Sequence, residues 1–252
     1  MIYDLQRASL WKRISAFLFD AILLGIVSVL AAWALSVLIG YDSQIARIDA
    51  AYDRYGELYG VNFDMSLEEY EAQTPEQLET VNAAYAALAA DEEAAAAYGT
   101  VVQMTLLITS LGILLGYALM EFAIPLKIGN GQSLGKKIFG IALMQQDGVQ
   151  LNSRVLFVRT FLGKYTLETM VPAMIILMIW FGMLGLTGTL VLAGILLIQM
   201  VLICRHRRMI IHDLLAGTVA VDFASQMIFA NQEALISYKQ KAHAEKAARE
   251  PY

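Results

Sequence analysis

Long apolar runs separated by polar segments dominate this chain. Residues 21–40 carry no charge, and a second apolar run covers about 101–126. A third run at 166–204 is thirty-nine residues long and almost entirely apolar. About twenty apolar residues are enough for an α-helix to cross the hydrocarbon core of a bilayer. The pattern therefore predicts an α-helical integral membrane protein whose first span covers about 14–39.

The third apolar run is too long for one span. A single helix of this length would extend about 58 Å, nearly twice the hydrocarbon thickness. Gly182, Gly185 and Gly188 cluster at its middle. We therefore expect two spans, about 167–184 and 188–204, joined by a tight turn. With the first two runs, this predicts four transmembrane helices.

The polar segment between the first two spans differs in kind from the others. Residues 42–99 hold thirteen acids and only two bases. Ser66-Leu-Glu-Glu69 and Thr74-Pro-Glu-Gln77 have the pattern of capping boxes, in which side chains at both ends satisfy the first helical N–H groups. We expect helices over about 43–59, 66–73 and 75–98, the last running on into span two.

The segment after span two is basic, and its pattern changes to that of strands. An apolar stretch at 138–145, the Asp147-Gly148 turn and 149–151 predict a β-hairpin. Ser153 is placed to cap a short amphipathic helix over 154–163. In the tail, 218–222 reads as a strand that would pair with the hairpin, and a charged helix follows residue 226.

These expectations divide the chain into six segments. They are a lead-in with span one (1–40), an acidic helical region outside the cytoplasm (41–99), span two (100–126), a basic cytoplasmic loop (127–165), a hairpin of spans three and four (166–204) and a cytoplasmic tail (205–252).

The distribution of charge orients the chain in the membrane. Sixteen of the eighteen bases lie in the amino terminus, the 127–165 loop and the tail, including a basic cluster at 205–208. Loops rich in lysine and arginine stay in the cytoplasm. Four spans place these three segments together in the cytoplasm, whereas a single span at 166–204 would separate them. Both termini are therefore expected in the cytoplasm, with the acidic helices outside.

Composition narrows the class of protein further. Hydrophobic residues make up 58 % of the chain, which is high for a soluble domain. The single cysteine excludes an internal disulfide. No small-residue cleavage site stands out after the first apolar run, so we expect a retained signal-anchor helix rather than a signal peptide.

Five charged residues are expected near the cytoplasmic ends of the spans, where an unpaired charge is costly. They are Arg13, Asp20, Glu121, Arg159 and Asp213, and Glu168 is expected at the same level. One interpretation is a site that binds a cation or relays protons, with the arginines neutralising the aspartates and Glu121 exchanging a proton. The other is structural, with buried ion pairs that lock the cytoplasmic segments against the spans.

The sequence gives weaker signals for a phosphate-binding loop and for a metal site. Gly131 to Lys137 differs from a phosphate-binding loop in spacing and lacks its final Ser or Thr, so we expect Lys136 and Lys137 to contact lipid phosphates instead. The three histidines have no metal-ligand spacing with cysteine. We expect no metal, no cofactor, no enzymatic activity and no nucleic-acid binding.

Several separated motifs together resemble the RDD family of bacterial membrane proteins. They are Arg13 with Asp20, Gly131-Gln-Ser-Leu-Gly-Lys-Lys-Ile-Phe-Gly-Ile141, Asp147-Gly148, Arg159 and His212-Asp213-Leu-Leu-Ala-Gly-Thr218. The similarity covers 7–40 and 101–222, and the one arginine and two aspartates of the family name would be Arg13, Asp20 and Asp213. The resemblance implies a polytopic plasma-membrane protein of poorly defined activity, sometimes associated with transport.

Two functions remain open from the sequence. The first is ion-linked transport or permeation through the cytoplasm-facing polar cluster, which in a protein of four spans would require an oligomer. The second is a non-transporting membrane scaffold or regulatory subunit that binds a partner protein. The expected partners are the lipid bilayer and either further copies of the chain or another membrane protein.

Overall fold

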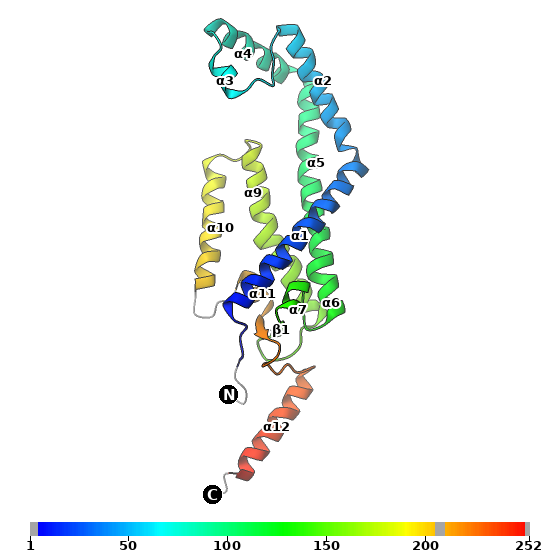
Figure 1. Ribbon diagram of the computed structural model, residues 1–252, viewed down its shortest axis with the longest axis vertical. Coiled ribbons are helices and arrows are strands. Elements are labelled where there is room, and N and C mark those ends of the chain that lie inside the picture. The colour runs from blue at the N-terminus through cyan, green and yellow to red at the C-terminus, as the bar shows by residue number, and fades with distance from the viewer. Residues whose placement is uncertain (1–4, 205–209, 250–252) are drawn as a thin grey trace. The chain divides into compact units, whose positions relative to one another are not determined.

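The computed structural model of the chain describes residues 5–204 and 210–249, so the predicted basic cluster at 205–208 lies outside the described residues (Figure 1). The chain forms two compact units. We call Ala32–Ser110 the insert unit and the remainder of the described chain the main unit. Helices α1 (Leu10–Ile39) and α5 (Glu92–Tyr117) each contribute residues to both units.

Three helical segments in the described part of the chain are long and apolar enough to cross a membrane. The first is α1. The second, Glu92–Ile128, consists of α5, the π-helix η1 (Ala118–Ala123) and α6 (Ile124–Ile128). The third, Ser153–Trp180, consists of α8 (Ser153–Phe157), the π-helix η2 (Val158–Met170) and α9 (Val171–Trp180).

The region of the fourth predicted span forms α10 (Leu186–Cys204), in which Leu186–Val201 is a shorter apolar helix. It packs beside α9 in the main unit (Figure 1). The predicted break is present, but α9 ends at Trp180 rather than near residue 184. Gly182 adopts φ +70°, a left-handed conformation that favours glycine and turns the chain out of the helix.

Within the main unit, α1 and α5 approach closely at Gly116. A Cβ atom on Gly116 would lie 2.2 Å from the Ser28 hydroxyl oxygen and 3.2 Å from a methyl carbon of Leu24. Small residues permit such approaches between membrane helices, where close packing replaces the hydrophobic effect. The rest of this part of α1 leaves large apolar side chains exposed, including Phe17, Ile22 and Val29.

The insert unit contains α2 (Tyr41–Tyr59), α3 (Leu67–Glu71) and α4 (Pro75–Ala90). Both predicted capping boxes are confirmed, at Ser66 before α3 and at Thr74 before α4. The ring of Phe63 packs between two tyrosine rings in this unit. It makes edge-to-face contacts with Tyr52 at 5.2 Å and Tyr85 at 4.9 Å between ring centroids.

The predicted continuous helix over 75–98 is wrong, because the chain breaks at Asp91 between α4 and α5. The Asp91 carboxylate accepts hydrogen bonds from the backbone N–H groups of Glu93 at 2.8 Å and Ala94 at 3.1 Å. It also accepts from the Tyr55 hydroxyl at 3.1 Å and pairs with Arg54. An aspartate that can cap a new helix therefore competes with continuation of the alanine-rich one.

Removing the Asp91 cap will loosen the start of α5. The Ala94 N–H bond is the largest influence on the Asp91 pKa and, with the Tyr55, Glu93 and Arg54 contacts, lowers it despite partial desolvation. The capping contribution is therefore complete above the ordinary carboxyl range and is lost as pH falls through the lowered pKa. We expect Asp91→Ala to speed amide hydrogen exchange at Glu93 and Ala94.

The measurement is amide exchange followed by NMR and corrected for the intrinsic pH dependence. Asp64→Ala is the matched control, because Asp64 is an exposed acid of the same unit. Unchanged exchange at Glu93 and Ala94 in Asp91→Ala would contradict the capping role.

The main unit contains a small antiparallel sheet of β1 (Ile141–Gln145) and β2 (Thr218–Asp222). Ile141 lies opposite Asp222 and Gln145 opposite Thr218, so the tail strand pairs as the sequence predicts. The other edge of β2 meets the amino terminus, where Arg7 forms an antiparallel bridge with Val221. The sheet thereby joins residues close to both ends of the chain.

The predicted hairpin is reduced to its turn. Gln145 N–H donates to the Val149 carbonyl at 2.8 Å, and a single bridge joins Met144 to Gln150. Residues 149–151 form no strand of the two-stranded sheet, because Val149 instead bridges to Phe229, just before α12 (Gln232–Arg249). Val149, Phe229 and Leu235 pack together and hold the start of α12.

The predicted short amphipathic helix is also corrected. Asn152, rather than Ser153, is the cap, accepting from the Val155 N–H at 2.8 Å. The helix does not end near Gly163 but continues as η2 and α9 to Trp180. The two remaining short helices, α7 (Leu134–Ile138) and α11 (Ile211–Ala216), bring the polar residues described next against these long segments.

Candidate functional site

Asp20 on α1 is buried and holds the loop that follows α6. Its Oδ1 accepts the Gly135 backbone N–H at 2.8 Å, and its Oδ2 accepts the Ser133 hydroxyl. The carboxylate thus satisfies groups at the start of α7 from a helix more than a hundred residues earlier. Gly135 is required for this approach, because a Cβ there would lie 2.5 Å from the Ala16 carbonyl oxygen.

Lys136 extends these contacts to Glu121, which is buried in η1. The Lys136 ammonium nitrogen lies 2.7 Å from the Ser133 hydroxyl oxygen, 3.4 Å from Asp20 Oδ2 and 3.6 Å from Glu121 Oε2. On its other side, Glu121 Oε1 lies 2.7 Å from the ammonium of Lys164 in η2. Two carboxylates and two ammonium groups therefore form a continuous chain of contacts.

Arg159 begins a second set of buried contacts from the same π-helix. Its Nε and Nη2 donate to Asp213 Oδ1 at 3.1 and 2.9 Å, and Nε also lies 3.2 Å from the Thr218 hydroxyl oxygen. The Thr218 hydroxyl donates to the same Asp213 oxygen at 2.8 Å. Arg159 is 2 % exposed, and its Nη1 has no hydrogen-bond partner among the described residues.

His212 completes this second set. Its ring Nδ1 lies 2.7 Å from Glu168 Oε2, and its backbone N–H donates to Glu168 Oε1 at 2.8 Å. Its Nε2 lies 3.7 Å from Asp213 Oδ1. The backbone of α11 approaches η2 closely here, because a Cβ on Gly163 would lie 2.6 Å from His212 Cβ.

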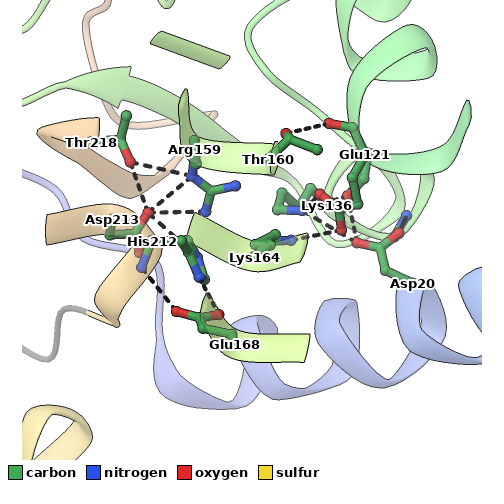
Figure 2. A network of polar contacts seen from close by, with 12 residues as sticks. Asp20, Glu121, Lys136, Arg159, Thr160, Lys164, Glu168, His212, Asp213 and Thr218 are labelled. Carbon is green, nitrogen blue, oxygen red and sulfur yellow. Dashed lines mark hydrogen bonds and ion pairs between the residues drawn. The ribbon is translucent and has the colours of Figure 1, made fainter. Parts of the chain in front are cut away.

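We call these eight side chains the charged network (Figure 2). They are Asp20, Glu121, Lys136, Arg159, Lys164, Glu168, His212 and Asp213. Figure 2 shows Arg159 between the Asp213 side and the Glu121 side. The two sides meet along η2, where the Thr160 hydroxyl next to Arg159 donates to the Glu121 carbonyl at 3.0 Å.

The π-helical geometry of η2 brings its charged residues onto one side. Arg159 and Lys164 are five apart, and in a π-helix hydrogen bonds run from each residue to the fifth along. In an ordinary α-helix the two would point about 140° apart, at about 100° per residue. Sequence periodicity read for α-helices therefore missed Lys164 as a member of the network, and it placed Glu168 at the right level without assigning it to the cluster.

The electrostatics of the α11 side chains follow from burial and from Arg159. Burial alone would raise the pKa of Asp213, but the Arg159 guanidinium, His212 and the Thr218 hydrogen bond together hold it well below its usual range. Burial is the main influence that lowers the pKa of His212, followed by the charge of Arg159. Asp213 and Glu168 oppose that decrease without reversing it.

Of the five residues that the sequence singled out, four lie in the network. Asp20, Glu121, Arg159 and Asp213 are all 6 % exposed or less. Arg13 lies half-buried on α1, seven residues before Asp20, and the lysine that reaches Asp20 is Lys136. Whether these residues form an ion site or a structural clamp stays a prediction.

The expectation that Lys136 contacts lipid phosphates is corrected. Its side chain is 12 % exposed and turns inward, because two buried carboxylates attract its ammonium group. Lys137 is exposed and remains a candidate for lipid contact. Among residues 5–204 and 210–249, no group of three or more His, Cys, Asp or Glu side chains is arranged to hold a metal ion.

Comparison with known proteins gives a family for this arrangement. The model of the RDD family matches residues 7–217, which includes every member of the charged network. No curated protein and no solved structure matches the chain.

Proposed function

Since the chain belongs to the RDD family, we propose that it carries out proton- or cation-linked transport through the charged network. The observation that carries this proposal is a set of eight ionisable side chains, five of them buried and the other three no more than 16 % exposed, between membrane helices and the segments packed on them. Ionisable groups are costly in such a place, and they commonly mark ion pathways or proton relays.

The proposed topology has four spans, α10 being the fourth, and both termini in the cytoplasm of a bacterial plasma membrane. The distribution of lysine and arginine supports it, because an even number of spans keeps the three basic segments together. In this topology the charged network would lie at the cytoplasmic side of the membrane, and the acidic segment 41–99 would be extracytoplasmic. An oligomer would supply the additional membrane helices that a pathway needs.

Asp20 is the residue to test in transport. We expect purified protein in liposomes to move protons or monovalent cations, and Asp20→Asn to abolish that flux. Asparagine keeps an oxygen acceptor for the Gly135 N–H but removes the charge that faces Lys136. Glu245→Gln, an exposed substitution on α12, is the matched control. Absence of flux in tight, oriented wild-type liposomes would refute the transport proposal.

A second candidate is a non-transporting scaffold or regulatory subunit that holds a partner protein. It is supported by the fact that both aspartates already have partners. Asp20 accepts hydrogen bonds from Ser133 and Gly135 and pairs with Lys136. Asp213 pairs with Arg159. In this role the network would be a clamp between the spans and the tail. Crosslinking in membranes would then yield one dominant heterologous partner, whereas only self-crosslinks would count against it.

Neither proposal requires a cofactor, a nucleic acid or a covalent step by the protein. The proposed partners are the lipid bilayer and either further copies of the chain or another membrane protein. No enzymatic role is proposed.

A further inference from the structure

We infer that His212 is a proton-binding site, and that proton uptake at its Nε2 moves Asp213 from Arg159 toward the imidazolium. As the proton-exchanging group of a transporter this assignment rests on the proposed function, but proton binding itself can be tested without transport. The inference stands on the placement of one imidazole between two carboxylates.

The contacts with Glu168 determine which nitrogen of the neutral His212 ring carries the proton. Glu168 accepts the His212 backbone N–H and lies 2.7 Å from Nδ1, which fixes the ring orientation and assigns the neutral-ring proton to Nδ1. Nε2 then presents its lone pair to Asp213 Oδ1 at 3.7 Å. Two acceptors facing each other gain nothing, whereas a proton on Nε2 converts the contact into an ion pair.

The carboxylates around His212 favour the uptake of one proton. On this side of the network, the Asp213 carboxylate pairs with the guanidinium of Arg159, whereas the Glu168 carboxylate contacts His212. The nearest ammonium, Lys164, is in contact with Glu121. With one proton on His212, the two carboxylates would face two cations, the guanidinium and the imidazolium. Histidine is also the side chain whose ordinary pKa places its charge change between pH 5 and 8.

Protonation of His212 would also affect the hydrogen bonds of Arg159. Its Nε and Nη2 both donate to Asp213 Oδ1, the oxygen that His212 Nε2 also faces. The imidazolium would therefore compete with the guanidinium for one acceptor atom. Because Arg159 Nη1 is already without a hydrogen-bond partner, weakening this pair would leave Arg159 free to turn toward Glu121.

Within residues 5–204 and 210–249, the charged groups that face His212 come from two elements. Arg159, Lys164 and Glu168 approach from η2, Asp213 lies on its own helix α11, and β2 contributes the uncharged Thr218. The two carboxylates favour the imidazolium, and Arg159 and Lys164 oppose it. Substitutions of these four groups must therefore move the titration of His212 in opposite directions.

The test is an NMR titration of the full chain in lipid nanodiscs, with ¹⁵N-labelled histidine and arginine. A His206→Gln/His243→Gln background leaves His212 as the only histidine signal. We expect its Nε2 signal to titrate with a midpoint below about 6.5 and the Arg159 Nε signal to follow the same midpoint. Glu168→Gln should lower the midpoint by about one pH unit or more, and Lys164→Gln should raise it.

Some outcomes overturn the inference. A His212 ring that keeps one protonation state between pH 4 and 8, or a midpoint that Glu168→Gln leaves unchanged, contradicts the proton site. An Arg159 signal that ignores the His212 titration contradicts the exchange of partners. Lys164→Gln leaves the Arg159–Asp213 pair intact and so remains informative if variants of that pair fail to fold.

The same preparations separate the two proposals. If liposomes show no flux while His212 titrates as described, transport fails and the proton site stands. If flux is found and its pH profile is the same in His212→Gln as in the wild type, the proton-exchanging role of His212 fails and transport stands.

Discussion

Arg159→Met will destabilise the main unit by about 3–5 kcal/mol, the usual cost of removing one partner from a buried ion pair. The substitution leaves Asp213 charged and buried, with Thr218 as its remaining donor among the described residues and His212 nearby. The free energy of unfolding in mixed micelles is the quantity to measure. We expect this to be the largest effect of any single substitution in the charged network.

A double variant distinguishes the charge from the packing. Arg159→Met with Asp213→Leu removes both charges, and replacing a buried pair by apolar side chains is often close to neutral. We therefore expect the double variant to recover most of the lost stability. Arg154→Met, an exposed arginine on the same long helix, should change stability by no more than about 0.5 kcal/mol. A double variant as unstable as Arg159→Met would show that the loss does not arise from unpaired charge.

Gly135→Ala will release the loop that Asp20 holds. The added Cβ would lie 2.5 Å from the backbone oxygen of Ala16 and 2.9 Å from Asp20 Oδ1. A backbone carbonyl inside α1 cannot give way as a flexible side chain would, so α7 must move off α1. Overpacking of this kind costs about 1–3 kcal/mol. The broken Gly135–Asp20 hydrogen bond adds to that cost, because the carboxylate is buried.

Protection of the Gly135 and Lys136 amides from hydrogen exchange reports this release directly. Gly25→Ala is the matched control, since Gly25 lies on α1 five residues after Asp20 and has no atom within 4 Å of an added Cβ. It should leave the loop protected and, by helix propensity, raise stability by less than about 1 kcal/mol. If Gly135→Ala retains full protection at Lys136, the close approach of α7 to α1 is not what holds the loop.

Three long apolar helices and the burial of four charged side chains could be predicted from sequence. Asp20 and Glu121 interrupt or border apolar runs, where a charge needs compensation, so both were identified as candidates. The strand at 218–222 was recognised because its alternation of residues follows a break after a helical pattern. These features depend on local composition and spacing.

The partners of those charges could not be predicted in the same way. Asp20 meets Ser133 and Gly135 across more than a hundred residues, and no local pattern encodes that contact. Lys136 was expected at the lipid surface because a lysine pair near a span commonly lies there, yet one of the pair turns inward. The π-helical turns of η2 could not be predicted for a different reason. A π-helix changes which residues lie on the same side of the helix, but it has no distinctive amino-acid composition.

The pairing of residues 6–8 with β2 also sets the order in which the protein can be completed. Asp222 N–H donates to the Gln6 carbonyl at 3.0 Å, and Ala8 N–H donates to the Ala220 carbonyl at 3.3 Å. A ribosome adding about 5–20 residues per second would need roughly 10–40 s to reach β2 after making the first segment. Asp20 is therefore synthesised before Ser133, Gly135 and Lys136, and β2 can pair with residues 6–8 only after all of these have been made.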